Sequence, residues 1–246
     1  WLWLFSDDDI AAPTCVQVFL DALARDKNPS DLWRFDLEFI DESGEVTHTC
    51  APHPLSETAA ELLENVLVPR GRDWRAPDHI FSRRVYETFG GFEDFPNAIF
   101  SDTVTWIKFS ALSGVKTLRG PKLSWRFSGS NTTSHSFKRQ RHIAKPLFMF
   151  HRWIAEFAQT LPPDRQEHLR ELRREQFMDW LSKKPIPPAG LIDALDVANA
   201  LWPERKVSNA VRLLRGEVRA AAWRFPLARR FQAWRLKRAT QAAPAA

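Results

Sequence analysis

The sequence of 246 residues is poor in cysteine and has no long apolar run. Its two cysteines, Cys15 and Cys50, stand in unrelated contexts without a CxxC or metal-ligand spacing, which argues against a disulfide framework and fits a reducing cytoplasm. No stretch reaches the roughly 18 apolar residues of a transmembrane helix. We recognise no internal repeat and no signal peptide. Because an apolar stretch starts at Trp1, we expect the chain to be a fragment of a longer protein.

What is present describes an ordinary soluble protein, with 44% hydrophobic and 26% charged residues. The length suits one large domain, or a medium domain with an appendage. The net charge of +5 is unevenly spread. Residues 205–246 carry eleven Lys or Arg side chains and one acid, Glu217, so the body is slightly acidic and the tail strongly basic.

The chain opens with WLWLFSDDDI, in which five large apolar residues predict a buried strand. Ser6 and three aspartates follow. Adjacent carboxylates repel one another and are costly to desolvate, so they need an explanation. One is a solvated turn that caps a helix at Pro13. The other is a divalent-cation site, because carboxylate oxygens at a strand end suit Mg²⁺ or Mn²⁺ and a phosphate.

The rest of the body alternates between helical and extended patterns. Thr58 and Glu61 form a capping-box pattern that opens a helix through Leu67. The other expected elements are a helix at 13–25, a hairpin of strands 32–40 and 46–50, a segment 79–92 that turns from extended to helical and stops at Gly90-Gly91, a helix from Asp102 to Gly114, and one or two strands at 115–127. This order predicts an α/β fold with a mixed sheet.

Three segments together carry a resemblance: the strand ending in DDD, FGGFEDFPNAIFSDTVTWIKFSALSG, and LSWRFSGSNTTS. In this order they resemble the second half of a family 2 inverting glycosyltransferase with the GT-A fold, over roughly residues 1–135. The resemblance implies a partial GT-A-type mixed sheet with flanking helices in residues 1–136. The half of that family that recognises the nucleotide base would precede Trp1, so the donor nucleotide and sugar cannot be read.

The donor side of the implied site rests on four residues. By the resemblance, Asp7 and Asp9 would be ligands of Mg²⁺ or Mn²⁺, which stabilises the charge of a departing nucleoside diphosphate. Asp8 would reach the ribose or a water molecule in the second shell of the metal ion. Arg126 would pair with a phosphate, or equally with one of the body's excess acids. Ser128 stands where the family often has histidine, and His135 is a candidate substitute or a surface residue.

The acceptor side rests on four more. By the resemblance, Asp102 would be the catalytic base that deprotonates the acceptor hydroxyl, although Ser101 replaces the usual glutamate. Its alternative role is a helix N-cap. Gly90 and Gly91 would lie near the acceptor, or simply cap a helix C-terminus. Trp106 would stack on a sugar ring, or belong to the core.

From about Phe137 the composition changes to long helices, which we expect to form an all-helical extension over 137–204. Residues 205–246 then form a basic amphipathic tail with interleaved Trp and Phe. Such a tail could pack on the domain as a helical appendage or dock on an anionic membrane surface. No recognised nucleic-acid-binding module accompanies the charge, so nucleic acid is not the expected partner.

The sequence therefore predicts a metal-dependent enzyme that transfers a sugar from a nucleotide sugar to a glycan or lipid-linked acceptor in cell-surface polysaccharide synthesis. We expect it in the cytoplasm, at the inner face of the membrane. Two alternatives stay open. A phosphoryl-transfer enzyme would also use strand-end aspartates, although Ala11 stands where such sites need Thr or Val. A non-catalytic helical scaffold could carry a degenerate transferase half.

Overall fold

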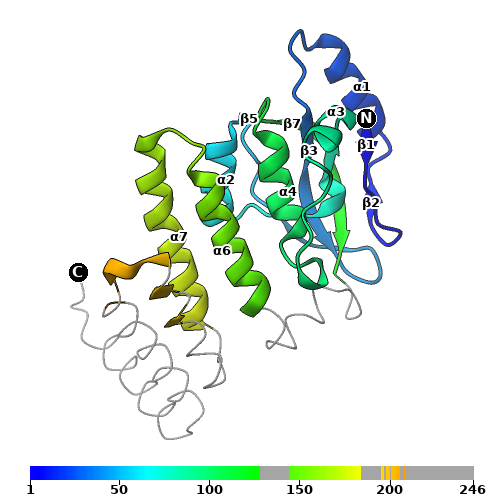
Figure 1. The fold of residues 1–246 in the computed structure, drawn as a ribbon. Helices are drawn as coiled ribbons and strands as arrows, with labels where there is room; N and C mark the ends of the chain where they lie inside the picture. Colours follow the sequence, from blue (N-terminus) through cyan, green and yellow to red (C-terminus); the bar gives the residue numbers. More distant parts are fainter. Residues whose placement is uncertain (128–143, 184–194, 197, 200, 206–207, 209–246) are drawn as a thin grey trace, which may run out of the picture. The chain divides into compact units, whose positions relative to one another are not determined.

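The computed structural model describes residues 1–127, 144–183, 195–196, 198–199, 201–205 and 208 (Figure 1). The chain divides into two compact units, Trp1–Arg173 and Arg174–Ala246. All residues of the expected site lie in the first unit. The tail at 206–207 and 209–246, Ser128 and His135 lie outside the described residues.

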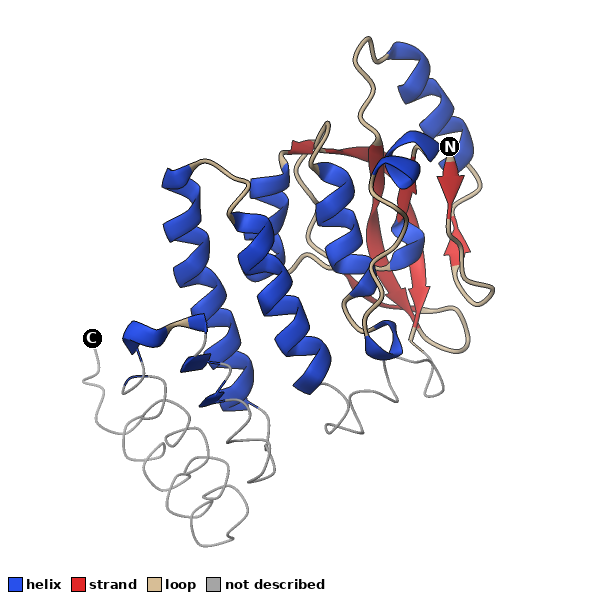
Figure 2. Ribbon diagram, viewed as in Figure 1, coloured by secondary structure: helices blue, strands red, loops and turns tan. Residues whose placement is uncertain are grey.

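The first unit is an α/β fold built on a mixed sheet, as expected (Figure 2). The strand order is β1-β6-β3-β7-β2. The two long central strands, β3 (Leu32–Ile40) and β7 (Val115–Arg126), run parallel, and the remaining pairs are antiparallel. The shorter strands are β1 (Leu2–Trp3), β2 (Ile10–Ala11), β4 (Val46–Thr49), β5 (Ser56–Glu57) and β6 (His79–Phe81). The predicted strand 32–40 and its return strand are confirmed.

The predicted buried strand at residues 1–5 is wrong. Only Leu2 and Trp3 pair with β6, and both are half-buried. Leu4 and Phe5 are 50% and 39% exposed. The physical reason is position: β1 lies at one end of the strand order, where only β6 is its neighbour. Apolar composition predicted burial, but the described residues do not cover these side chains.

The helices begin and end close to their sequence signals. They are α1 (Cys15–Arg25), α2 (Ala59–Leu67), α3 (Arg83–Thr88), α4 (Ser101–Ser110), α6 (Ala144–Ala158) and α7 (Pro163–Lys183), with single 3-10 turns η1 (Ala76–Asp78), η2 (Pro96–Ala98) and η4 (Pro203–Arg205). The capping box of Thr58 and Glu61 is present. The segment after α4 closes at Gly114, whose N–H donates to the carbonyl of Ser110 at 2.8 Å.

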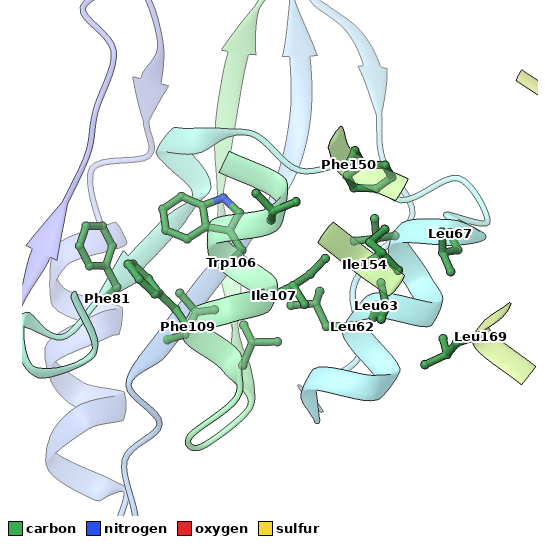
Figure 3. Close-up of a cluster of buried hydrophobic side chains, with 14 of the residues drawn as sticks. Leu62, Leu63, Leu67, Phe81, Trp106, Ile107, Phe109, Phe150, Ile154 and Leu169 are labelled. Carbon is green, nitrogen blue, oxygen red and sulfur yellow. The ribbon is translucent and has the colours of Figure 1, made fainter. Parts of the chain in front are cut away.

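The two faces of the sheet carry separate hydrophobic cores, because successive side chains of a strand point to opposite faces. Trp33, Phe35 and Leu37 of β3 pack with α1 on one face. On the other face, α2, α4 and α6 enclose the larger cluster (Figure 3). In that cluster Phe100 stacks on Phe150 of α6, with ring centroids 4.6 Å apart. Helix α6 therefore belongs to the same compact unit as the sheet.

Three features of the fold meet at one end of the sheet. The strands β3 and β7 both end there, the loop between β1 and β2 turns there, and α4 begins there (Figure 1). This end therefore holds both the three aspartates of the opening segment and Asp102. None of the described helices combines the length and hydropathy that crossing a membrane requires.

Candidate functional site

The aspartate loop, residues 7–9, is fixed to the end of β7. Asp7 is exposed, whereas Asp8 and Asp9 are half-buried. The Oδ1 atom of Asp9 accepts the backbone N–H of Arg126 at 2.8 Å. Burial raises the pKa of the Asp9 carboxyl, and the charge of Asp8 adds to the rise, while the N–H of Arg126 and the positive charges of Arg126 and Arg75 oppose it. Asp9 is thus a partly desolvated carboxylate held by a strand end.

Arg126 ties this loop to its neighbour. Its Nε donates to the carbonyl of Asp8 at 2.8 Å, and its Nη1 donates to the carbonyls of Asp41 and Glu42 at 2.7 and 3.0 Å. The guanidinium therefore links the aspartate loop with the turn between β3 and β4. The expected pairing of Arg126 with a phosphate or with a carboxylate stays a prediction.

Asp102 is the second residue of α4. The N-cap position is Phe100, so the alternative that Asp102 is the N-cap is wrong. Its Oδ1 accepts the N–H of Thr103 at 2.7 Å and the hydroxyl of Thr103 at 3.3 Å. Burial raises the pKa of this carboxyl, the nearby Asp78 adds to the rise, and the charge of Arg75 opposes it. A carboxyl whose pKa is raised by its surroundings is better suited to accept a proton than a solvated one.

The residues before Asp102 adopt an uncommon backbone conformation. Asn97, Ala98 and Phe100 have φ values of 58°, 55° and 67°, in the left-handed region that side chains other than glycine seldom occupy. The strain is held by the core through the stack of Phe100 on Phe150. The hydroxyl of Ser101 also accepts the N–H of Phe95 at 3.0 Å. Strain of this kind often accompanies functional sites, and here it sets where α4 starts.

A short segment that the sequence reasoning missed, Asp73–Arg75, contacts the surroundings of both carboxylates. The Cζ of Arg75 lies 4.6 Å from the ring centroid of Trp125, the residue before Arg126. The indole Nε1 of Trp74 donates to the hydroxyl of Thr103 at 3.0 Å, which connects the segment to the first turn of α4. The signal was the run DWRAPDH, where charged and aromatic residues crowd together between two predicted elements.

The glycine pair of the expected acceptor side has a local structural role. The N–H groups of Gly90 and Gly91 donate to the carbonyls of Glu87 and Tyr86, and both glycines have positive φ, so they close α3. A Cβ at Gly91 would lie 3.2 Å from the hydroxyl of Tyr86, so the close approach there comes from this chain. Their contact with an acceptor stays a prediction.

Trp106 belongs to the core. It is 1% exposed, stacks on His79 with ring centroids 4.5 Å apart and packs against Phe81 and Phe109 (Figure 3). Its indole presents no exposed face on which a sugar could stack. We therefore correct the expected acceptor role of Trp106, because the register of α4 turns this side chain inward, and leave it out of the site.

The aspartate loop could bind a metal ion only together with ligands from outside the protein. Among the described residues, no group of three or more His, Cys, Asp or Glu side chains could hold a metal. A preformed cage of protein ligands is therefore not present in this part of the chain. Mg²⁺, however, is often bound by one or two carboxylates together with substrate phosphates and water. Asp7 and Asp9 could supply carboxylates of this kind.

We compared the chain with known proteins. No protein-family model, no curated protein and no solved structure matches it.

Proposed function

We propose that the protein is an inverting glycosyltransferase that uses a nucleotide-sugar donor, with Asp9 on the donor side and Asp102 as the base. The observation that supports this most is that the loop with Asp9 and the start of α4 lie at the same end of the sheet (Figure 1). The two carboxylates come from motifs far apart in the sequence, yet both are partly desolvated. A GT-A-type arrangement of the sheet is part of the proposal.

In this reaction, the oxygen of an acceptor hydroxyl attacks the anomeric carbon of the sugar. The bond from that carbon to the diphosphate breaks with inversion, and the nucleoside diphosphate leaves with the bonding electrons. Asp102 takes the hydroxyl proton as the new bond forms. The aspartate loop, held by Arg126 at the end of β7, orients the diphosphate. Mg²⁺ or Mn²⁺ supplies charge stabilisation to the diphosphate when bound.

The donor side is tested by binding rather than by turnover. Calorimetry with a panel of nucleoside diphosphates, with and without Mn²⁺ or Mg²⁺, should show metal-dependent binding to the protein. Asp9→Ala should lose that binding while the circular dichroism spectrum is kept. Asp21→Ala is the matched control, because Asp21 lies on α1 and pairs only locally, with Gln17 and Arg25. Undiminished binding by Asp9→Ala in excess chelator overturns the donor assignment.

We also propose that the basic tail binds an anionic membrane surface. Residues 205–246 lie almost wholly outside the described residues, so this argument rests on charge. Each Lys or Arg near an anionic surface contributes about 1 kcal/mol to binding. If the acceptor is lipid-linked, docking at the inner leaflet would bring the enzyme close to it. Co-sedimentation should show binding to vesicles with phosphatidylserine but not to neutral vesicles, reduced by salt and lost on truncation at Pro203. Equal binding to both vesicle types removes the proposal.

A further inference from the structure

We propose that Trp74 and Thr103 are positioning residues of Asp102. The indole of Trp74 fixes the hydroxyl of Thr103, which holds one oxygen of the Asp102 carboxylate and leaves the other oxygen to take the proton of the acceptor. The inference deepens the proposed function and rests on it for the role of Asp102 as a base. The hydrogen bonds themselves belong to the folded chain, so they can be tested without turnover.

The direction of these hydrogen bonds follows from the chemistry of the indole. The Nε1 of Trp74 lies 3.0 Å from Oγ1 of Thr103. An indole N–H can only donate, so the hydroxyl oxygen of Thr103 is the acceptor. The single hydrogen of that hydroxyl must then point to a different atom. Among the described residues, the acceptor it meets is Oδ1 of Asp102, at 3.3 Å. A relay of hydrogen bonds therefore runs from Trp74 through Thr103 to Asp102.

The two oxygens of Asp102 have different surroundings. Oδ1 also accepts the backbone N–H of Thr103 at 2.7 Å, so two donors of one residue hold this oxygen. Oδ2 accepts no hydrogen bond from the part of the chain that the structure describes. It is not among the buried polar atoms without a partner in that part, so solvent reaches it. Oδ2 is therefore the oxygen that can meet an acceptor hydroxyl, while Oδ1 sets the orientation of the carboxylate.

Trp74 is itself anchored, which makes it a fixed donor. Its half-buried ring packs against the larger hydrophobic cluster. Its N–H donates to Oδ1 of Asp73 at 2.9 Å, and the Nη1 of Arg75 donates to its carbonyl at 2.6 Å. The Cζ of Arg75 lies 4.6 Å and 5.2 Å from the ring centroids of Trp125 and Phe39. The ends of the two central strands thus hold the segment that presents the indole to the first turn of α4.

The relay is tested first without substrate, on the indole N–H signals in ¹⁵N NMR spectra. The signal that Trp74→Phe removes belongs to Trp74. Thr103→Val removes the hydroxyl with little change in volume, so the Trp74 signal should shift and its N–H should exchange faster with water. Thr103→Ser keeps a hydroxyl and should leave the signal close to its wild-type position. Thr105→Val is the matched control, because Thr105 lies on the same helix but its hydroxyl donates to the carbonyl of Ser101.

A Trp74 signal that moves no more in Thr103→Val than in Thr105→Val overturns the relay. If Thr103→Val does not fold, Thr103→Ala provides the second variant without the hydroxyl, and the same shift is expected.

The positioning role is tested in the transfer reaction. Thr103→Val should lower kcat about 10-fold, the effect of one hydrogen bond to a charged group, while KM for the donor stays unchanged. The acid limb of kcat against pH should move to higher pH, because the lost hydroxyl favoured the ionised carboxylate. Trp74→Phe should change both quantities in the same direction, and Thr103→Ser should behave like the wild type.

An unchanged kcat and an unmoved acid limb in folded Thr103→Val would show that Thr103 does not position the base. A shifted Trp74 signal in a protein that turns over no nucleotide sugar has a different meaning. It leaves the relay standing and removes the proposed function instead.

Discussion

The start of α4 and the aspartate loop carry the two carboxylates of the proposed site, and they are held by different means. Seven of the ten residues of α4 are buried, so the core fixes the helix that presents Asp102. The loop that presents Asp9 is flanked by two strands of two residues each and by exposed apolar side chains. It is held by two hydrogen bonds from Arg126, whose N–H donates to Oδ1 of Asp9 and whose Nε donates to the carbonyl of Asp8.

This difference suggests a division of roles. A base must be held accurately relative to the reacting hydroxyl, which a buried helix provides. A loop that receives a diphosphate can adjust to its ligand, because few packed contacts oppose movement.

The largest effect should come from a matched pair of isoleucines. Ile107 of α4 is 0% exposed, whereas Ile10 at the end of the aspartate loop is 46% exposed. Ile107→Ala should lower the free energy of unfolding by about 2–5 kcal/mol, because it leaves a cavity. Ile10→Ala should change it by about 0.5 kcal/mol or less. Urea unfolding measures both. Equal losses would mean that the loop is packed as firmly as the helix, and the comparison would fail.

The next largest loss of stability should come from alanine substitutions at Gly90 and Gly91, and it should differ between the two. Gly90→Ala should cost about 1–2 kcal/mol, because it forces a positive φ of 70° on alanine although space is open. Gly91→Ala should cost more, since its Cβ would also press on Tyr86, and Lys108 of α4 binds the carbonyl of Gly91 at 2.9 Å. Thermal unfolding of the two variants provides the measurement. A larger loss at Gly90 would contradict the assigned contacts.

The smallest expected effect is a gain in the free energy of unfolding. Because burial raises the pKa of Asp102 above its ordinary 3.8, ionising this carboxyl costs the folded protein free energy that the unfolded chain does not lose. The cost is absent below the ordinary pKa, grows as the pH rises through the folded pKa, and is complete above it. Asp102→Asn should therefore stabilise the protein by about 1 kcal/mol near neutral pH.

The gain from Asp102→Asn should disappear below about pH 4, where the wild-type carboxyl is protonated in both states. Asp7→Asn is the control from the loop: Asp7 is exposed, so the change should be within about 0.5 kcal/mol. Chemical unfolding at several pH values distinguishes the two. A loss of stability in Asp102→Asn at neutral pH would show that its charge supports the fold.

Local signals explain which parts of the fold could be predicted. The strand 32–40 and the helix after Thr58 were correct, because alternation and a capping box act within a few residues. The strand at 1–5 was wrong, because covering Leu4 and Phe5 would require neighbours that no local pattern specifies. Burial of Trp106 likewise depends on His79 and Phe81, which belong to a different element.

In the candidate site, too, contacts between segments far apart in the sequence could not be predicted. Asp9 and Asp102 were predicted because motif order picks out carboxylates at strand and helix ends, and their roles stay predictions. The contacts of Arg75 with the rings of Phe39 and Trp125 could not be predicted, because these rings belong to two strands that lie far from Arg75 in the sequence. A pattern in one segment does not report such a contact.

The most direct test of the account is the transfer reaction of Asp102→Asn. Release of nucleoside diphosphate from a panel of nucleotide sugars would be measured for the wild type and for this variant, with Mn²⁺ present and with Asp94→Asn, an exposed carboxylate before α4, as the control. We expect Asp102→Asn to bind the nucleotide normally while transfer falls by roughly 10²–10⁴, the usual contribution of a general base. Transfer at the wild-type rate by Asp102→Asn would contradict the assignment of Asp102 as the base.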